Sequence, residues 1–496
     1  MNPQEDSKSY KQIFKSTALL GGAQVFNIGI GVILNKVISI LLGPVGMGIA
    51  GLLTSTQQVI GSFSNVGISQ SGIKVISKAH EEGDTEELGK STYVIKRLTW
   101  IAGLLGVLVT LILSKQLSLW AFGNEDFTIS FVVLSLSMLF YQLTRGNYLI
   151  INGCRKLRYY VKATLLGNFL SLFITIPLYY LYGKDAIAPV LVLLSLSTFI
   201  CSYYFYKKIG IKEIKIPFSE FKVRSVDVLT IGIAISASDV FPVIASFVIR
   251  SYVSLMDGLS DVGMFAAGFT ILNGYVGLVF QSMSADYFPR LYAAADNNVR
   301  AEDIFNKQME ITILLLFPLV MCLVALGKFV VLILYTEEFL PMLPMLYWGA
   351  LGMIAKALNW GYGSILIPKK EAKAYFILSL VSAIIYLGVN IIMYNLWGLA
   401  GMGFAFLSSQ LIDFLFVYLY VSRKYKIRLR HKNIADFLII SILITFVIII
   451  KINFVENIIL FLVLCLFVIT TMFYSYYRLN RLLNIADFLK SKFRKS

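Results

Sequence analysis

Long apolar blocks alternate with short polar stretches along the whole chain. A helix that crosses a bilayer needs roughly 20 apolar residues, and about fourteen blocks approach that length. The polar faces that would mark the buried helices of a soluble protein are largely missing from them. We therefore predict an all-α polytopic membrane protein with about 14 transmembrane helices. The expected segments are 13–42, 46–72, 98–113, 127–153, 163–181, 186–206, 228–253, 263–287, 311–335, 345–367, 375–394, 399–421, 437–450 and 458–474.

A duplication underlies this series of segments. The tripeptide VGM at 45–47 recurs 217 residues later at 262–264, and the basic end of the fourth segment, 152–160, matches 367–375 with an offset of 215 residues. Each half holds six segments, an even number, so both halves begin on the same side of the membrane. Such parallel repeats commonly place a substrate site at their interface. We predict two pseudo-symmetric six-helix lobes followed by two additional C-terminal helices.

The longest polar stretch divides the two halves. We predict an N-terminal lobe at 1–210, a cytoplasmic linker at 211–227, a C-terminal lobe at 228–425, and a last region at 426–496. That region holds two additional transmembrane helices and a basic tail, whose pattern is typical of a short amphipathic helix on the membrane surface. The mixed-charge stretch 74–90 is expected to be a solvated loop.

The stretch LLGPVGMGIAGL at 41–52 is expected to be the outer turn between the first two helices. Gly43 and Pro44 would turn the chain, and Gly46 and Gly48 would allow close approach of helix backbones. The repeat assigns the same place in the second half to VGMFAAGF at 262–269. Both stretches are therefore interpreted as structural rather than as substrate contacts.

The charge distribution sets the orientation. The net charge is +16, and 57% of the residues are hydrophobic, against about 45–50% in soluble domains. With the N-terminus inside, 36 of the 44 Lys and Arg residues fall in cytoplasmic loops and tails, as the positive-inside rule requires. The prediction is a multi-pass protein of the cytoplasmic (inner) membrane with both termini cytoplasmic. This distribution leaves no role for nucleic acid.

Cysteine and histidine give no sign of metal or catalytic chemistry. None of the four cysteines forms a CxxC pair, and the two histidines, His80 and His431, have no partners at ligand spacing. We predict no cofactor, no metal site and no catalytic residues.

Four cations fall inside apolar segments or at their ends: Lys36, Arg145, Arg250 and Lys356. A charge in the hydrocarbon costs at least about 2.5–3.5 kcal/mol on insertion scales, so it usually faces a cavity or a partner. Snorkelling to the membrane surface is the alternative for the first three, whereas Lys356 lies too near the middle of its segment. We interpret the four as substrate-binding residues.

Two carboxylates, Asp239 and Asp413, lie in other segments and are candidates for ion coupling. Asp239 could instead form a structural bridge with Lys356 or Arg145. Either way the interior is net positive, which suits an anionic substrate. A phosphate or pyrophosphate attached to a lipid fits both the charge and the location.

Amides and aromatic residues in the segments have two interpretations. A single amide is interpreted as a residue that joins two helices by a hydrogen bond. As a set, the amides could line a path for sugar hydroxyls, and the aromatic rings could stack on sugars. The residues are Gln24, Asn27, Asn35, Gln57, Gln58, Asn65, Gln70, Asn273, Gln281, Asn359, Tyr141, Trp360 and Tyr362.

The order of these features resembles a known family. Lys36 followed by LLGPVGMGIAGL resembles the first helix junction of polysaccharide flippases of the Wzx type, and Pro242 and Arg250 followed by VGMFAAGF resemble the second-half junction. Lys356 with the following PKKEAKAY resembles the tenth helix. The resemblance covers most of 10–425. These flippases belong to the multidrug/oligosaccharidyl-lipid/polysaccharide exporter (MOP) superfamily, and O-antigen translocases look most similar.

The resemblance implies a function and its partners. Two lobes would enclose a cationic cavity that opens alternately to either side, and the substrate would be an undecaprenyl-pyrophosphate-linked oligosaccharide, such as an O-antigen unit of lipopolysaccharide. Membrane lipids surround the protein. H+ or Na+ is a candidate coupling ion, and a polysaccharide polymerase with chain-length machinery is a candidate partner.

Three alternatives stay open. An ion-coupled multidrug exporter of the same superfamily would need buried carboxylates that outnumber the cations. A lipid II flippase would also carry an anionic head group. A membrane enzyme that modifies polysaccharide would need a large outer loop or a cluster of catalytic residues, which the sequence lacks.

Overall fold

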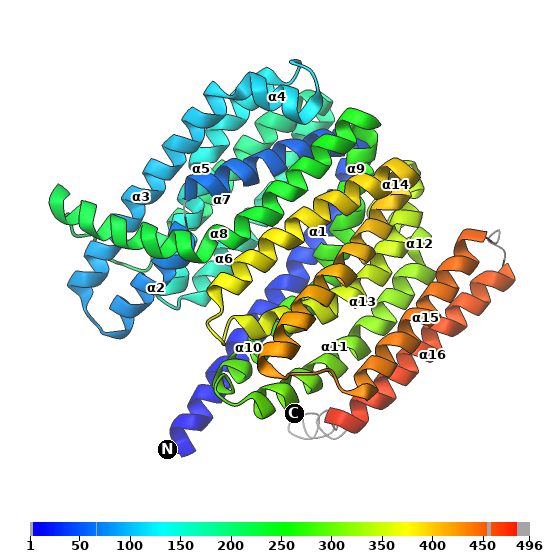
Figure 1. Cartoon of the computed structure of the whole chain (residues 1–496). Coiled ribbons are helices and arrows are strands. Elements are labelled where there is room, and N and C mark those ends of the chain that lie inside the picture. The colour runs from blue at the N-terminus through cyan, green and yellow to red at the C-terminus, as the bar shows by residue number, and fades with distance from the viewer. Residues whose placement is uncertain (1–2, 66, 454–457, 484–496) are drawn as a thin grey trace, which may run out of the picture. The chain divides into compact units, whose positions relative to one another are not determined.

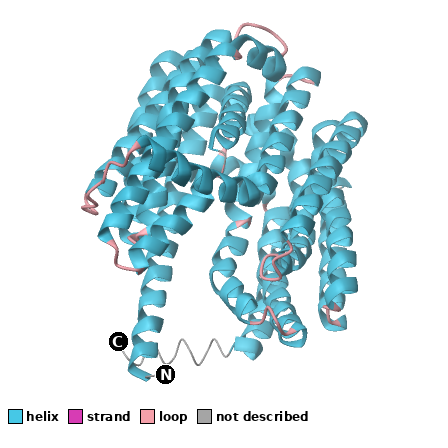
Figure 2. Cartoon of the chain, turned by 60° about the vertical axis from the view of Figure 1, so that its left-hand side comes forward, coloured by secondary structure: helices cyan, strands magenta, loops and turns pink. Residues whose placement is uncertain are grey.

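The computed structural model describes residues 3–65, 67–453 and 458–483, and in these residues every regular element is helical (Figures 1 and 2). By packing, the chain forms two units, Met1–Gly263 and Met264–Ser496. The first unit holds α1 (Pro3–Asn65), α2 (Ile68–Glu81), α3 (Thr85–Ile112), α4 (Ser114–Phe122), α5 (Thr128–Gly153), α6 (Leu157–Tyr182), η1 (Gly183–Ala186), α7 (Ile187–Lys207) and α8 (Phe218–Met256).

Helix α9 (Leu259–Phe269) contains the boundary between the two units. The second unit continues with η2 (Thr270–Val276), α10 (Leu278–Ala293), α11 (Asn298–Ala325), α12 (Gly327–Leu334), η3 (Glu337–Met342), α13 (Leu343–Leu366), α14 (Ala372–Tyr425), α15 (His431–Asn453) and α16 (Ile458–Leu483). The expected all-α polytopic fold is confirmed.

Eleven helical stretches in the described residues are long and apolar enough to cross a membrane. Three of them, 26–65, 157–207 and 372–425, contain 40, 51 and 54 residues. About 20 residues suffice for one crossing, so each of the three is long enough to cross twice. Two crossings in each would give the expected fourteen, and that exact number stays a prediction.

Each of the three long stretches turns at a glycine whose backbone lies in a region that side chains disfavour. The φ angles are +62° at Gly43, +56° at Gly183 and +56° at Gly398. Gly183 and Gly398 are 215 residues apart and have similar ψ angles, −132° and −141°. The offset equals one found in the sequence, so the duplication extends to the backbone geometry of the turn.

In the first unit, α5 is the central helix and packs against α1, α2, α3, α4, α6 and α7. Its C-terminal half contributes Leu149, Ile150 and Ile151 to a core that also contains Ile76 of α2 and Ile95 of α3. Helix α8 also packs against α1 and α2. The packing boundary therefore differs from the boundary of the duplication, and the lobe limits expected at residues 211–227 stay a prediction.

In the second unit, α13 packs along α14, α11 and α15, and α16 packs against α11. Arg478 of α16 donates to Glu310 of α11 at 3.1 Å and to Asp436 of α15 at 3.0 Å, which ties the last two helices to the unit. Helix α16 continues to Leu483, and the basic tail beyond it lies outside the described residues.

One expected loop is wrong in part. The stretch 74–90 is mostly helical, because α2 continues to Glu81 and buries Ile76 and Ala79 on one face. Asp84 then starts α3 by accepting hydrogen bonds from the backbone N–H groups of Glu86 and Glu87, as N-cap residues do. His80 consequently lies in a helix rather than in a loop. The segment expected as a linker, 211–227, is extended to residue 217, and α8 begins at Phe218.

Candidate substrate site

Arg145 lies on the central helix of the first unit, α5, and is partly buried. Its guanidinium carbon is 5.6 Å from the centroid of the Tyr141 ring, a cation–π distance. Tyr141 packs against Gly61 of α1, where an added Cβ would come within 2.8 Å of the ring. The ring therefore fixes the position of the Arg145 side chain within the span.

Asp239 lies on α8 of the same unit. Its carboxylate interacts electrostatically with the Arg145 guanidinium. Among the described residues, the two side chains form no ion pair within 4.0 Å. The structure thus brings Asp239 near Arg145, one of the two partners expected for it, without closing a bridge. The Asp239 side chain is exposed.

A row of buried amides joins α1 to α5. Gln57 donates to Ser137 Oγ at 2.9 Å, Asn65 donates to Gln142 Oε1 at 3.0 Å, and Gln142 donates to the Gly61 carbonyl at 2.7 Å. These contacts are hydrogen bonds between helices. The interpretation of Gln57 and Asn65 as residues that hold two helices together is therefore confirmed. Gln142 was not predicted to be part of this group, because its only signal in the sequence is an amide inside an apolar run.

Other amides from the same set are exposed. Gln58 and Gln70 present their side chains at the surface of the unit, whereas Asn27 is tied to α6 through a 3.0 Å hydrogen bond donated by Asn168. The set therefore divides into members that hold helices together and members that are accessible to a substrate.

Lys36 and Arg250 lie on α1 and α8 of the first unit, and both are partly buried. Arg250 Nη1 is 3.5 Å from the Gly51 carbonyl oxygen, at the upper limit for a hydrogen bond. The contact places the Arg250 guanidinium beside the first stretch of the duplicated motif.

The two copies of the duplicated motif meet backbone to backbone. An added Cβ at Gly48 would lie 2.0 Å from the Leu259 carbonyl oxygen, and one at Gly263 would lie 1.9 Å from the Pro44 carbonyl oxygen. The expected close packing is confirmed for Gly48. At Gly46 an added Cβ would lie 2.4 Å from the Cβ of Leu42, which precedes the turn at Gly43 and so belongs to the other side of that turn.

Lys356 lies near the middle of α13 in the second unit and is partly buried. Its Nζ donates to Asn273 Oδ1 at 2.7 Å and lies 5.8 Å from the centroid of the Phe280 ring. Among the described residues, no carboxylate lies within 4.0 Å of this ammonium. A lysine has three N–H donors, so two remain after the contact with Asn273.

The partner of Lys356 lies in an irregular helix. Asn273 falls within η2, residues 270–276, which has π-helical hydrogen bonding between α9 and α10. A π-helical stretch changes the direction of the side chains that follow and is frequent at functional sites. Asn273 is one of the amides identified in the sequence, but the pattern of residues gives no sign of its pairing with Lys356.

Asp413 lies in the second half of α14 and is buried. Ser382, in the first half of the same kinked helix, is hydrogen-bonded to its carboxylate, and Oδ1 has no partner among the described residues. Nearby amides are paired, since Asn359 donates to Gln410 Oε1 at 3.1 Å.

The interpretation of Tyr362 as a sugar-stacking residue is wrong. Its side chain is fully buried and packs against Phe305, Phe414 and Tyr418. Trp360, on the same helix, stays partly exposed and contacts Phe280. Tyr141 and Trp360 thus remain the accessible aromatic residues of that group.

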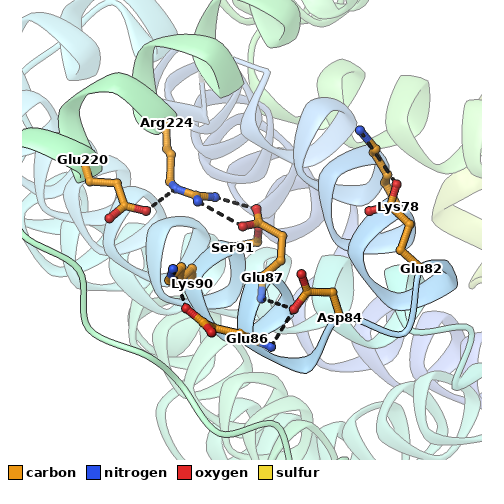
Figure 3. Close-up of polar contacts among 9 residues, drawn as sticks. All are labelled: Lys78, Glu82, Asp84, Glu86, Glu87, Lys90, Ser91, Glu220 and Arg224. Atoms are coloured by element: carbon orange, nitrogen blue, oxygen red, sulfur yellow. Dashed lines mark hydrogen bonds and ion pairs between the residues drawn. The ribbon is translucent and has the colours of Figure 1, made fainter.

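Charged clusters outside the spans hold connecting segments in place. Figure 3 shows Arg224 of α8 between two carboxylates: Nη2 donates to Glu87 at 2.9 Å and Nε donates to Glu220 at 2.8 Å. In the second unit, hydrogen bonds from Lys424, Tyr425 and Tyr420 lower the pKa of Glu371 to about 2. Within the described residues, no group of three His, Cys, Asp or Glu side chains is placed to hold a metal ion.

Comparisons with known proteins give two family matches. The family described as "Polysaccharide biosynthesis protein" matches residues 13–295, and the family "Lipid II flippase MurJ" matches residues 269–473. The first match covers more than half of the chain. No curated protein matches the sequence.

Solved structures share the fold at low sequence identity. The lipid II flippase MurJ in an inward closed conformation is 15% identical, with a TM-score of 0.70 over 95% of this chain and 99% of that chain. An inward-facing MATE-family multidrug transporter of the MOP superfamily is 15% identical, with a TM-score of 0.69 over 82% and 94%. A MOP transporter from Pyrococcus furiosus, described by a reversed polarity of its binding pocket, is 14% identical, with a TM-score of 0.60 over 83% and 96%.

Proposed function

Because the chain belongs to the polysaccharide biosynthesis protein family and has the fold of MOP-superfamily flippases and exporters, we propose that it translocates an undecaprenyl-pyrophosphate-linked oligosaccharide across the cytoplasmic membrane. The protein is a multi-pass membrane flippase of the lipid-linked polysaccharide or lipid II class, and the families that it matches are transport families rather than enzyme families. The sugar head group passes through a cationic cavity by alternating access while the lipid tail stays in the bilayer.

One observation carries the substrate class: Lys356 is a cation within a membrane span whose hydrogen-bonding partner is a neutral amide. An uncompensated charge in this position is costly and marks a substrate path. A pyrophosphate oxygen supplies the missing negative charge and accepts the two N–H donors that Asn273 leaves unused. Asn273 orients the ammonium.

Arg145 is a second substrate contact in this proposal. Its guanidinium is held by the Tyr141 ring, which is neutral and leaves the charge available. Arginine can bind a phosphate through two parallel hydrogen bonds. Lys36 and Arg250, beside the duplicated glycine motif, are the proposed contacts nearer the outer surface. Exposed Gln58 offers an amide to sugar hydroxyls.

Asp239 and Asp413 are the proposed ion-coupling residues, and H+ or Na+ is the ion. Asp239 is accessible and interacts electrostatically with Arg145. A change in the charge of Asp239 therefore alters the attraction of Arg145 for an anion. Asp413 is buried and has one carboxylate oxygen without a hydrogen-bond partner. In this proposal both termini lie in the cytoplasm, and a polysaccharide polymerase with its chain-length machinery is a partner.

A lipid II flippase is the second candidate, because the MurJ family matches residues 269–473, which include Lys356. The two substrates share the undecaprenyl pyrophosphate and differ in the sugar and the peptide. A multidrug exporter for cations is disfavoured, since Lys356 and Arg145 would repel a cationic compound.

The test is a reconstituted flipping assay with three fluorescent substrates. Proteoliposomes of the full chain receive an undecaprenyl-pyrophosphate-linked oligosaccharide, lipid II, or a lipid with a cationic head group, and the fluorophore exposed on the outer leaflet is quenched over time. We expect translocation of the oligosaccharide lipid and none of the cationic lipid. Faster translocation of lipid II would favour the second candidate. Translocation of the cationic lipid alone would contradict the proposal.

A further inference from the structure

A pocket of about 490 Å³ opens in the first unit where α3 meets the segment that precedes α8. It is lined by Tyr93, Lys96, Arg97, Trp100, Glu213 and Lys215. None of these residues has a part in the transport site proposed above. The pocket combines three cations, one carboxylate and two aromatic rings.

The charges of this pocket do not cancel. Glu213 accepts a hydrogen bond from Lys96 Nζ at 2.6 Å and another from the Tyr206 hydroxyl at 2.7 Å, so the carboxylate compensates Lys96. Arg97 and Lys215 are exposed, and among the residues that the structure describes neither has a carboxylate within 4.0 Å. Arg97 lies over the Tyr93 ring at 5.4 Å. The pocket therefore offers two uncompensated positive charges.

An apolar surface continues from the pocket along α3. Ile101, Leu104, Leu108 and Leu111 follow Arg97 at intervals of four and three residues, which places them on one face of the helix. Their exposed fractions are 54%, 49%, 56% and 39%. The distance from Arg97 to Leu111 is roughly 21 Å at 1.5 Å per residue, more than one leaflet of a hydrocarbon core about 30 Å thick.

Trp100 marks the level of the pocket in the membrane. It is 44% exposed and lies one turn before Leu104, at the junction of the cationic and apolar parts of α3. Tryptophan concentrates at the boundary between head groups and acyl chains. Cations on one side of this boundary and an apolar face on the other match the two ends of a lipid molecule.

We propose that this pocket binds the head group of an anionic membrane phospholipid, whose acyl chains lie along the exposed face of α3. The Arg97 guanidinium grips the phosphate through its paired N–H groups, and the Lys215 ammonium adds a second charge from the other wall. A soluble phosphate would satisfy the cations but would leave the adjoining apolar face unused. The charge and the apolar face together therefore favour a lipid.

The bound lipid joins two elements. Arg97 belongs to α3, whereas Lys215 belongs to the extended segment 210–217. The same elements are already joined by Lys96 with Glu213 and by the Ile214 N–H, which donates to the Gly89 carbonyl at 3.3 Å. An anionic lipid thus adds a second tie between the segment that precedes α8 and the first unit.

Trp100 provides a reporter for the test. The full-length protein is placed in phosphatidylcholine nanodiscs that contain increasing fractions of phosphatidylglycerol with brominated acyl chains, which quench tryptophan fluorescence on contact. Trp100→Phe gives the background of the other four tryptophans. We expect Trp100 to be quenched at a low fraction of the anionic lipid and much less by brominated phosphatidylcholine at the same fraction.

Charge variants identify the site. One basic residue near a membrane surface contributes about a five-fold effect. The fraction of phosphatidylglycerol needed for half-quenching should therefore rise roughly five-fold in Arg97→Gln or Lys215→Gln, and roughly 25-fold in the double variant. Lys212→Gln is the matched control, because this exposed lysine lies on the same segment but does not line the pocket. It should behave like the wild type.

Three results would overturn the proposal. Equal quenching by both brominated lipids would show that the pocket does not select an anionic head group. Relief of the quenching by millimolar inorganic phosphate would assign the site to a soluble anion. If the charge-preserving variant Arg97→Lys/Lys215→Arg lost selectivity as completely as the double glutamine variant, the effect would arise from altered structure rather than from lost charge.

Discussion

The contact between the two copies of the glycine motif gives a quantitative prediction. In Gly48→Ala the new methyl group would lie 2.0 Å from the Leu259 carbonyl oxygen, where an ordinary contact begins at 3.4 Å. In Gly263→Ala the corresponding distance to the Pro44 oxygen is 1.9 Å. The obstructing atoms belong to the backbone and cannot rotate away, so the two helices must separate by more than 1 Å.

Overpacking of this kind costs typically about 1–3 kcal/mol. Alanine offsets part of this, because it is favoured over glycine in a helix by about 0.5–1 kcal/mol. The control is Gly29→Ala in the same helix, α1, where an added Cβ meets nothing within 4 Å. Gly29→Ala should gain only the stability that alanine has over glycine in a helix. The difference in stability between this control and Gly48→Ala therefore gives the cost of overpacking.

Thermal unfolding of the purified protein in detergent measures the effect. We expect Gly48→Ala and Gly263→Ala each to unfold at a lower temperature than Gly29→Ala. The double variant should cost less than the sum of the two, since one separation of the helices relieves both contacts. If both single variants unfolded at the same temperature as the Gly29→Ala control, the close approach of the two motifs would be refuted.

Three further predictions concern the charged segments. Glu371 has a pKa lowered to about 2; its stabilising effect is complete above the unfolded pKa near 4.5 and is lost as the pH falls toward 2. The melting temperatures of wild type and Glu371→Gln should therefore differ at pH 6, approach each other as the pH falls below 4.5, and converge near pH 2; a constant gap would contradict the assignment. Arg224→Gln should release α8 from Glu87 and speed trypsin cleavage at 208–215, whereas cleavage at the wild-type rate would show that the ion pair does not hold this segment. Cysteines at Glu337 and Lys212, both exposed, should label from outside and inside respectively, and the reverse pattern would overturn the topology.

Much of the fold follows from the sequence because the bilayer imposes a length on each apolar block. The turns at Gly43 and Gly183 were predictable for the same reason, since an apolar run of 40 residues or more must reverse within it. The short helix α2 was not predicted. Its charged residues resemble a loop, and only the burial of Ile76 and Ala79 on one side reveals a helix.

The cations of the proposed site could be named from the sequence, whereas the side chains that contact them could not. Lys356 and Arg145 stand out because a cation in an apolar run is rare. The pairing of Lys356 with Asn273 depends on a π-helical stretch, and no periodicity in the sequence indicates where such a stretch begins. Gln142 looked like any other amide until its contacts with Asn65 and Gly61 were visible.

We propose that Lys356 binds the anionic head group of the lipid substrate. The direct measurement is the initial rate of translocation of the pyrophosphate-linked oligosaccharide by Lys356→Met and Lys356→Arg in proteoliposomes, with equal amounts of folded protein. A hydrogen bond to a charged group contributes about 1.5–3 kcal/mol, so the methionine variant should be slower by roughly 10- to 150-fold, and the arginine variant should retain more activity. Wild-type rates in Lys356→Met would contradict the account.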